Sequence, residues 1–239
     1  MDFSLFLPNM VKIWTKYWHV FLLQGLKNTL ILTCISVALG TSLGAVVAML
    51  RMSKSKLVRF IASFYIEVIR GTPILLQLYV FYFVLPNVFT FMKLSPFMWV
   101  SIALCVNSGA YVSEVIRSGI QAVDKGQAEA ARSLGLSEKQ TMMKIILPQA
   151  VRNILPALAN EFIMMLKETS LASTFFLGDL MTSYKIVNGA TMLTLEPMTI
   201  SALIYLCMTY PLSKIVERFE KKMASPNSFR KRKKLKKTA

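Results

Sequence analysis

Between two apolar segments the chain reads Asp124-Lys-Gly-Gln-Ala-Glu-Ala-Ala-Arg-Ser-Leu-Gly-Leu-Ser-Glu-Lys-Gln-Thr-Met-Met-Lys-Ile-Ile-Leu-Pro148, its longest polar and charge-rich stretch. Asp124 with Gln127, and Ser137 with Gln140, have the spacing with which capping boxes begin helices. Gly135 stands where a left-handed residue would end the first helix. The stretch therefore predicts two short helices joined by a glycine, a compact exposed surface that another protein can bind.

The composition of the chain is that of a membrane protein. Of 239 residues 54% are hydrophobic, and the formal net charge is +16. These two properties conflict in a soluble domain, whereas they agree in a membrane protein with basic loops. The three cysteines are an odd number and show no metal-binding spacing, so the sequence indicates neither a disulfide framework nor a metal site.

Five segments have the length and apolarity of membrane spans, for which about 20 mostly apolar residues are needed. They lie at about residues 26–50, 57–85, 96–116, 154–171 and 197–216. Pro73 falls inside the second segment and should kink or restart that helix. We favour one long broken span there over two short elements. The predicted fold is an all-α integral membrane protein with five transmembrane helices.

The distribution of lysine and arginine predicts the orientation, because cytoplasmic loops are enriched in them. Twenty-one basic residues fall at or after the ends of the first, third and fifth spans, and five fall on the other side. The 124–148 loop and the C-terminus are therefore expected in the cytoplasm, and the N-terminus outside. The predicted parts are an extracytoplasmic segment 1–25, a transmembrane domain 26–220 and a basic cytoplasmic tail 221–239. The tail is expected to attract anionic lipid rather than nucleic acid.

Polar side chains inside the predicted spans are candidates for a solute path, because ionisable groups in a bilayer are costly and usually face a cavity or the bundle interior. Glu67 and Arg70 share a helix face, so they can pair, either as a structural ion pair or in contact with solute. Asn107, Tyr111 and Glu114 form one polar stripe on the third span. Helix–helix hydrogen bonding and a solute path both fit Asn107 and Tyr111.

Glu161, near the middle of the fourth span, is the best single candidate for meeting a cationic group of the solute. The structural alternative is a partner on a neighbouring helix, such as Arg70. Glu114 lies near the cytoplasmic end of its span, where it can reach water or pair with Arg117. These residues define the predicted path: Asn107, Tyr111, Glu161, Glu114 and Glu67.

The sequence lacks the nucleotide-binding and catalytic motifs that we looked for. It has no glycine-rich phosphate loop that ends in Lys-Ser or Lys-Thr, so we expect no ATPase activity and no cofactor bound by this chain. It has neither Gly-x-Ser-x-Gly nor His-Glu-x-x-His, so an enzyme is not expected. The chain therefore offers a solute path and a cytoplasmic docking surface, and its energy must come from a partner.

The 124–148 loop resembles the cytoplasmic "EAA" loop of ABC importer permeases, in which Glu-Ala-Ala is followed at fixed spacing by Gly and by Ile-x-Leu-Pro. Here these elements are Glu129-Ala130-Ala131, Gly135 and Ile145-Ile146-Leu147-Pro148. Flanking sequences resemble the polar amino-acid uptake branch of that family, which imports histidine, glutamine, arginine or cystine: Arg70-Gly71-Thr72-Pro73 with Gln77, Ser108-Gly109-Ala110-Tyr111-Val112-Ser113-Glu114, Gly126-Gln127, and Lys167-Glu168-Thr169-Ser170-Leu171.

The resemblance implies a type I ABC importer fold in the cytoplasmic membrane of a prokaryote. It implies that two permease subunits form the path, as a homodimer or with a sister permease, above two ATP-binding subunits. An external solute-binding protein would deliver the amino acid. The helix at 129–134 would dock on the ATPase, so the expected coupling residues are Glu129, Ala130, Ala131, Leu134 and Gly135.

Three other hypotheses compete with that of an amino-acid importer. A permease of the same architecture could carry another small solute, such as an opine or an osmolyte. A stand-alone channel or secondary carrier is a second alternative, although an odd number of spans without inverted halves argues against a carrier. A membrane enzyme ranks last, because the sequence offers no nucleophile–base set.

Overall fold

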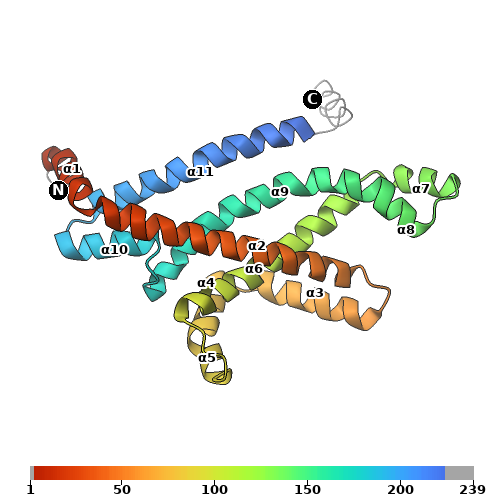
Figure 1. Ribbon diagram of the computed structural model, residues 1–239, viewed down its shortest axis with the longest axis horizontal. Helices are drawn as coiled ribbons and strands as arrows, with labels where there is room; N and C mark the ends of the chain where they lie inside the picture. Colours follow the sequence, from red (N-terminus) through yellow and green to blue (C-terminus); the bar gives the residue numbers. More distant parts are fainter. Residues whose placement is uncertain (1–2, 224–239) are drawn as a thin grey trace.

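The computed structural model describes residues 3–223, so most of the predicted basic tail, 224–239, lies outside the described residues. Over this range the chain is helical and contains no strand (Figure 1). The main helices are α1 Phe6–His19, α2 Lys27–Arg51, α3 Lys56–Gly71, α4 Ile74–Tyr79, α5 Leu85–Val88, α6 Pro96–Gln121, α7 Lys125–Ser133, α8 Glu138–Thr141, α9 Leu147–Glu168, α10 Leu180–Thr191 and α11 Leu195–Met223. Adjoining them are the 3₁₀ segments Phe3–Leu5 and Thr169–Phe175, and the π-helical segments Val20–Leu26, Val80–Val84 and Met142–Ile146.

The centre of the fold is the close crossing of α2 and α6, against which α9 packs. Glycines of α2 allow this approach. A Cβ added to Gly40 would lie 2.8 Å from the Cβ of Ser108, and one added to Gly44 would lie 2.7 Å from the Cβ of Val112. Small residues let helix backbones come this close where lipid supplies no hydrophobic driving force between helices.

Buried apolar clusters hold the helices together, and two of them contain most of the fully buried large side chains. The first contains Leu32 of α2, Leu78 of α4, Leu104 of α6 and Met165 of α9, all fully buried. The second joins α1, α10 and α11. The bundle is thus packed from segments that are distant in sequence.

The break at Pro73 is larger than a kink. Thr72 and Pro73 have extended backbone angles, as expected because a proline disfavours helix at the residue before it. Lys56–Gly71 and Ile74–Val88 are bent by 104° at this point. The predicted break is therefore confirmed, whereas the preference for one broken span over two short elements stays a prediction.

Within the described residues the structure has fewer helices that are long and apolar enough to span a membrane than the five that the sequence predicts. Between residues 3 and 223, three helical stretches are long and apolar enough to cross a membrane, namely Phe6–Arg51, Pro96–Gln121 and Leu195–Met223. The bent pair would make a fourth if it counted as one span. The first stretch also extends well before residue 26, because α1, Val20–Leu26 and α2 adjoin.

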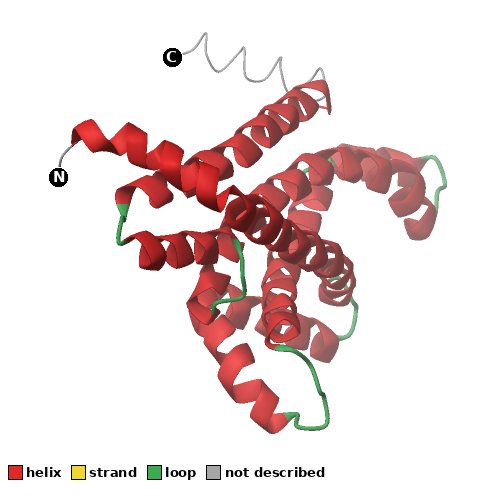
Figure 2. Cartoon of the chain, turned by 60° about the vertical axis from the view of Figure 1, so that its left-hand side comes forward, coloured by secondary structure: helices red, strands yellow, loops and turns green. Residues whose placement is uncertain are grey.

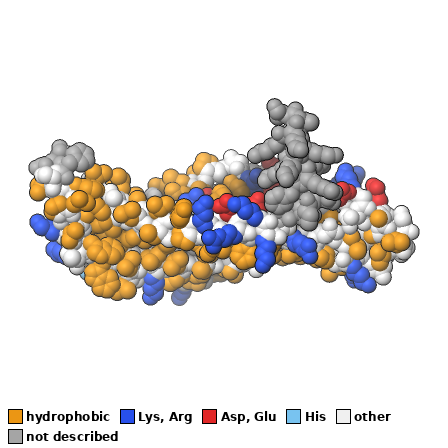
Figure 3. Space-filling view, turned by 90° about the horizontal axis from the view of Figure 1, so that it is seen from above, with side chains coloured by type: hydrophobic (Ala, Val, Ile, Leu, Met, Phe, Trp, Pro, Cys, Tyr) orange, Lys and Arg blue, Asp and Glu red, His pale blue; other side chains and the backbone are white. Residues whose placement is uncertain are grey.

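The ends of the molecule differ in character. α7 and α8 lie at one end of the long axis, and α1 and α10 lie at the other (Figure 1). Figure 2 shows the long helices packed side by side between these ends. On the face seen in Figure 3, apolar side chains dominate toward α1, and basic side chains gather in the middle and toward α7 and α8.

Candidate functional site

α7 carries the Glu-Ala-Ala sequence on a short helix with defined ends. Asp124 caps its N-terminus by accepting a hydrogen bond from the N–H of Gly126 at 2.7 Å. At its C-terminus the N–H of Leu136 donates to the carbonyl of Ala131, the long bond of a Schellman motif. Gly135 has a φ of +83°, which confirms the predicted left-handed C-cap.

The two predicted capping boxes have different outcomes. Ser137 and Gln140 form theirs in full, since each side chain accepts a hydrogen bond from the other residue's N–H. The box predicted for Asp124 and Gln127 is wrong. The side chain of Gln127 instead accepts a hydrogen bond from Gln149 at 3.3 Å, so a contact with the next helix replaces the local bond.

The residues predicted to couple to the ATPase differ in their exposure. Ala131 is buried, where α7 packs against Met142–Ile146. Glu129 and Ala130 are exposed, and Leu134 is 83% exposed. An apolar side chain this exposed, beside a carboxylate and a small residue at the tip of the molecule, is a surface feature that suits docking.

The second half of the loop is not a separate short helix, as the sequence predicted, but the beginning of a long one. α8, Met142–Ile146 and α9 adjoin from residue 138 to residue 168. Pro148 lies inside this run, two residues after the π-helical segment Met142–Ile146, and the helix continues past it. One helical rod therefore connects the EAA loop to Glu161.

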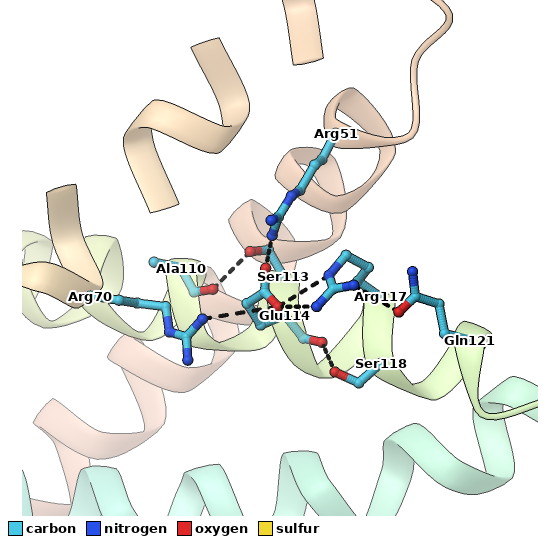
Figure 4. A network of polar contacts seen from close by, with 8 residues as sticks. All are labelled: Arg51, Arg70, Ala110, Ser113, Glu114, Arg117, Ser118 and Gln121. Atoms are coloured by element: carbon cyan, nitrogen blue, oxygen red, sulfur yellow. Dashed lines mark hydrogen bonds and ion pairs between the residues drawn. The ribbon is translucent and has the colours of Figure 1, made fainter. Parts of the chain in front are cut away.

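Glu114 is the centre of a charged cluster that joins three helices (Figure 4). It pairs with Arg51 at the end of α2, with Arg70 at the end of α3 at 3.9 Å, and with Arg117 on its own helix at 2.7 Å. Only 14% of the Glu114 side chain is exposed. One shielded carboxylate is thus the shared partner of three guanidinium groups, and the predicted Glu114–Arg117 pair is confirmed.

The predicted pair of Glu67 and Arg70 is not formed. Glu67 is exposed on α3, and among the described residues it takes part in no ion pair. Arg70 instead reaches Glu114, and its guanidinium lies 5.3 Å from the centre of the Tyr111 ring. Glu67 and Arg70 do lie on the same side of α3. Arg70 nevertheless pairs with Glu114 of α6, which is less exposed than Glu67.

Asn107 closes the break between α3 and α4. It is buried and donates a hydrogen bond to the side-chain oxygen of Gln77 at 2.9 Å. The amide of Gln77 in turn donates to the carbonyl of Ile69 at 2.7 Å and to the hydroxyl of Thr72 at 2.9 Å. It also donates to the carbonyl of Thr72 at 3.1 Å, so the Gln77 amide occupies two carbonyls, of Ile69 and Thr72, that the interrupted helix leaves free. Helix–helix hydrogen bonding therefore accounts for Asn107.

Glu161 lies on α9 where that helix packs against α6. It is 7% exposed, faces Ser108 of α6, and forms no ion pair with any described residue. Its suggested partner Arg70 is engaged by Glu114. Two of the five predicted path residues, Glu67 and Glu161, are carboxylates without an ion pair among the described residues, and of these two only Glu161 is buried. Asn107, Tyr111 and Glu114 belong to the interhelix network of α6.

Sequence reasoning missed Arg51 and Gln77 as members of this network. Arg51 was counted only toward topology, and Gln77 entered only as part of a family resemblance. A local signal existed for Gln77, because a polar side chain four residues after Pro73 can reach the carbonyls that the break exposes. Nothing near Arg51 in the sequence indicates a partner 63 residues away.

Several bacterial transport system permease proteins resemble this chain over most of its length. The arginine transport system permease protein ArtQ of Bacillus subtilis (strain 168) is 40% identical over 225 residues, covering 94% of this chain and 98% of the relative. The putative glutamine transport system permease protein GlnP of Rickettsia typhi is 41% identical over 217 residues, with coverages of 91% and 98%. GlnP of Escherichia coli (strain K12) is 34% identical, with coverages of 88% and 97%.

Solved structures share the fold. An amino acid ABC transporter crystallised with histidines superposes with a TM-score of 0.82 at 45% identity, covering 87% of this chain and 96% of that one. The MetNI methionine ABC transporter, inward-facing, gives 0.71 at 18% identity, which shows the fold alone. The model of the "binding-protein-dependent transport system inner membrane component" family matches residues 40–225. This chain therefore belongs to that family of membrane transport components.

Proposed function

We propose that this protein is the permease subunit of an ATP-driven importer that moves a polar amino acid across the cytoplasmic membrane. The observation that carries the proposal is the exposed, doubly capped α7 with its Glu-Ala-Ala sequence at the tip of the bundle. The relatives named for arginine and glutamine transport support the class of solute. ATP hydrolysis is assigned to partner subunits.

The proposed topology keeps five spans, with the N-terminus outside and the C-terminus in the cytoplasm. α9 supplies a span that a test of apolarity passes over, because it carries Arg152, Glu161, Lys167 and Glu168. Its contacts with α2, α6 and α11 surround it with protein, and a helix inside a bundle can carry polar groups that lipid would exclude. The bent pair α3–α4 contributes the second span.

The proposed coupling uses the continuous helical connection of the loop to α9. The two ATP-binding subunits would bind the exposed residues Glu129, Ala130 and Leu134. Movement of that face would be carried along the rod of residues 138–168, whose far half holds Glu161. The transport cycle is then a rocking of packed helices around the path between two copies of this chain, or between this chain and a sister permease.

For the path itself we keep Glu161 as the residue that meets a cationic group of the solute, either its α-amino group or a side chain. Tyr111 and Glu114 border the path through Arg70, which both of them contact. Asn107 shapes it by holding the α3–α4 break, and Glu67 stands at its edge. An external solute-binding protein would deliver the amino acid to the side away from α7.

Reconstitution tests the proposal. The purified chain, its ATPase subunits and its solute-binding protein are placed in proteoliposomes, and uptake of a labelled amino acid is measured with ATP inside the vesicles. Uptake should need all three components. Uptake by this chain alone would refute an ATP-driven importer, and competition by an opine or an osmolyte but by no amino acid would refute the solute class.

A further inference from the structure

The helical run that begins the described chain is too long to lie inside one membrane. Phe6–Arg51 has 46 residues, and a straight helix of that length would measure roughly 69 Å at about 1.5 Å per residue. The hydrocarbon core of a bilayer is only about 30 Å thick. α2, with 25 residues, is long enough to cross by itself. α1 must therefore lie at or beyond the membrane surface.

The direction of α1 agrees with a position at the surface. In Figure 1 α1 is seen nearly end-on while α2 and α11 run across the picture, and in Figure 2 α1 extends at length. The π-helical segment Val20–Leu26 lies at the change of direction. α10 fixes that segment, since Ser183 donates a hydrogen bond to the carbonyl of Val20 at 2.9 Å. Asn9 also binds Glu196 at the start of α11, at 3.2 Å.

The side chains of α1 divide into three faces. Ile13, with Met10 and Tyr17, packs against the cluster shared with α10 and α11. A second face is apolar yet uncovered by the described chain, with exposed fractions of 70% for Leu7, 63% for Val11, 41% for Trp14 and 44% for Trp18. Lys12 and Lys16 occupy the third face and are exposed.

We propose that α1 is an interfacial helix that lies in the plane of the bilayer on the face opposite the EAA loop. Leu7, Val11, Trp14 and Trp18 enter the boundary between headgroups and acyl chains. Lys12 and Lys16 contact the phosphates of anionic phospholipid. This arrangement places tryptophan at the level of the membrane that it prefers and pairs the cationic face with lipid of opposite charge.

Tryptophan quenching by brominated lipids tests the depth of α1. The chain has three tryptophans, and Trp99 is buried at 5% exposure, so it supplies a constant background. Trp14→Phe and Trp18→Phe each leave one reporter on α1, and the double variant measures the background. The chain and its ATPase subunits are placed in phosphatidylcholine bilayers brominated near the headgroup, midway or near the chain end.

Both reporters should be quenched most by bromines near the headgroup and should lie at equal depth. An upright helix would instead separate them by about 6 Å, because they are four residues apart. That difference, or a common depth near the bilayer centre, would overturn the proposal. Absence of quenching would also overturn it, because a second copy of this chain or another protein would then cover the apolar face.

The contact with lipid phosphate has its own test. Brominated phosphatidylglycerol, diluted into phosphatidylcholine without bromine, should quench Trp14 and Trp18 at least twofold more than brominated phosphatidylcholine at the same fraction. Lys12→Gln with Lys16→Gln should abolish this preference and leave the depth unchanged. Lys93→Gln, on the loop between α5 and α6, serves as the matched control. A preference that the double variant retains would overturn the role of these two lysines.

Discussion

α7 and α6 both carry charged side chains, but the two helices are held in place by opposite means. The ends of α7 are set by Asp124, Gly126, Gly135 and their near neighbours, within a few residues of one another. The polar groups of α6 are set by contacts with other helices: Asn107 binds Gln77, and Glu114 binds Arg51 and Arg70. Local bonds shape α7, and distant ones shape α6.

The difference has a physical cause in the surroundings of the two helices. α7 is exposed at the tip of the bundle, so its shape has to be fixed by caps before a partner arrives. α6 is packed between α2, α3 and α9, where an unpaired charge or amide would lose its hydration without compensation. A substitution on the exposed face of α7 should therefore have little effect on the stability of the rest of the fold. A substitution in the α6 network should affect the packing of several helices at once.

The largest effect on stability is expected from Glu114→Gln. The change leaves Arg51, Arg70 and Arg117 without their common carboxylate, and breaking a shielded pair from one side costs about 3 kcal/mol or more. Thermal unfolding of the purified chain in detergent measures the loss. Glu67→Gln, at an exposed carboxylate on the neighbouring helix, should leave the unfolding temperature unchanged. Equal behaviour of the two variants would mean that the cluster contributes nothing to the fold.

Gly135→Ala should come next, and its effect should stay within the EAA loop. A side chain at φ +83° is strained even though a Cβ there meets no atom within 4 Å, so the cost is about 1 kcal/mol, from the backbone alone. Hydrogen exchange of the α7 amides should accelerate, and ATPase activity should lose its dependence on solute. Gly135→Asn is the matched control, because asparagine tolerates this backbone conformation. Identical exchange in all three proteins would contradict the role of the cap.

Leu134→Asp should separate docking from folding. Because Leu134 is 83% exposed, the free energy of unfolding should change by less than about 0.5 kcal/mol. Its association with the ATPase subunits should weaken about tenfold, or about 1.4 kcal/mol. Co-purification at graded concentrations of the ATPase measures the association, and Leu136→Asp, just beyond the cap, tests whether any added charge has the same result. Unchanged association of the Leu134 variant would exclude this face from the interface.

Glu161→Gln should change the choice of solute more than the fold, since the exchange keeps the shape of the side chain and removes a charge that no described residue neutralises. Unfolding should shift by no more than about 1 kcal/mol. Uptake of a cationic amino acid should fall about tenfold relative to a neutral one, or about 1.4 kcal/mol of selectivity. Uptake of both solutes at the original ratio would make Glu161 a structural residue.

Residues whose partners are close in sequence were predicted well. The Ser137–Gln140 capping box, the Gly135 cap, the break at Pro73 and the Glu114–Arg117 pair are all present. The errors share the opposite property. The side chain of Gln127 bonds to Gln149 rather than to the backbone of Asp124, and Arg70 pairs with Glu114 rather than with Glu67. In each case a residue of another helix replaced a neighbour that had the right spacing.

By itself, the sequence determined the helical membrane class, the capped Glu-Ala-Ala loop and the family, because hydropathy, capping and motif spacing depend on short stretches of chain. Only the tertiary structure decided that Arg51, Arg70 and Glu114 meet, that Asn107 closes the α3–α4 break, and that α1 turns away from α2. The physical reason is burial. Inside the bundle a polar group needs a partner, and which helix supplies it depends on how the backbones cross, at glycines such as Gly40 and Gly44.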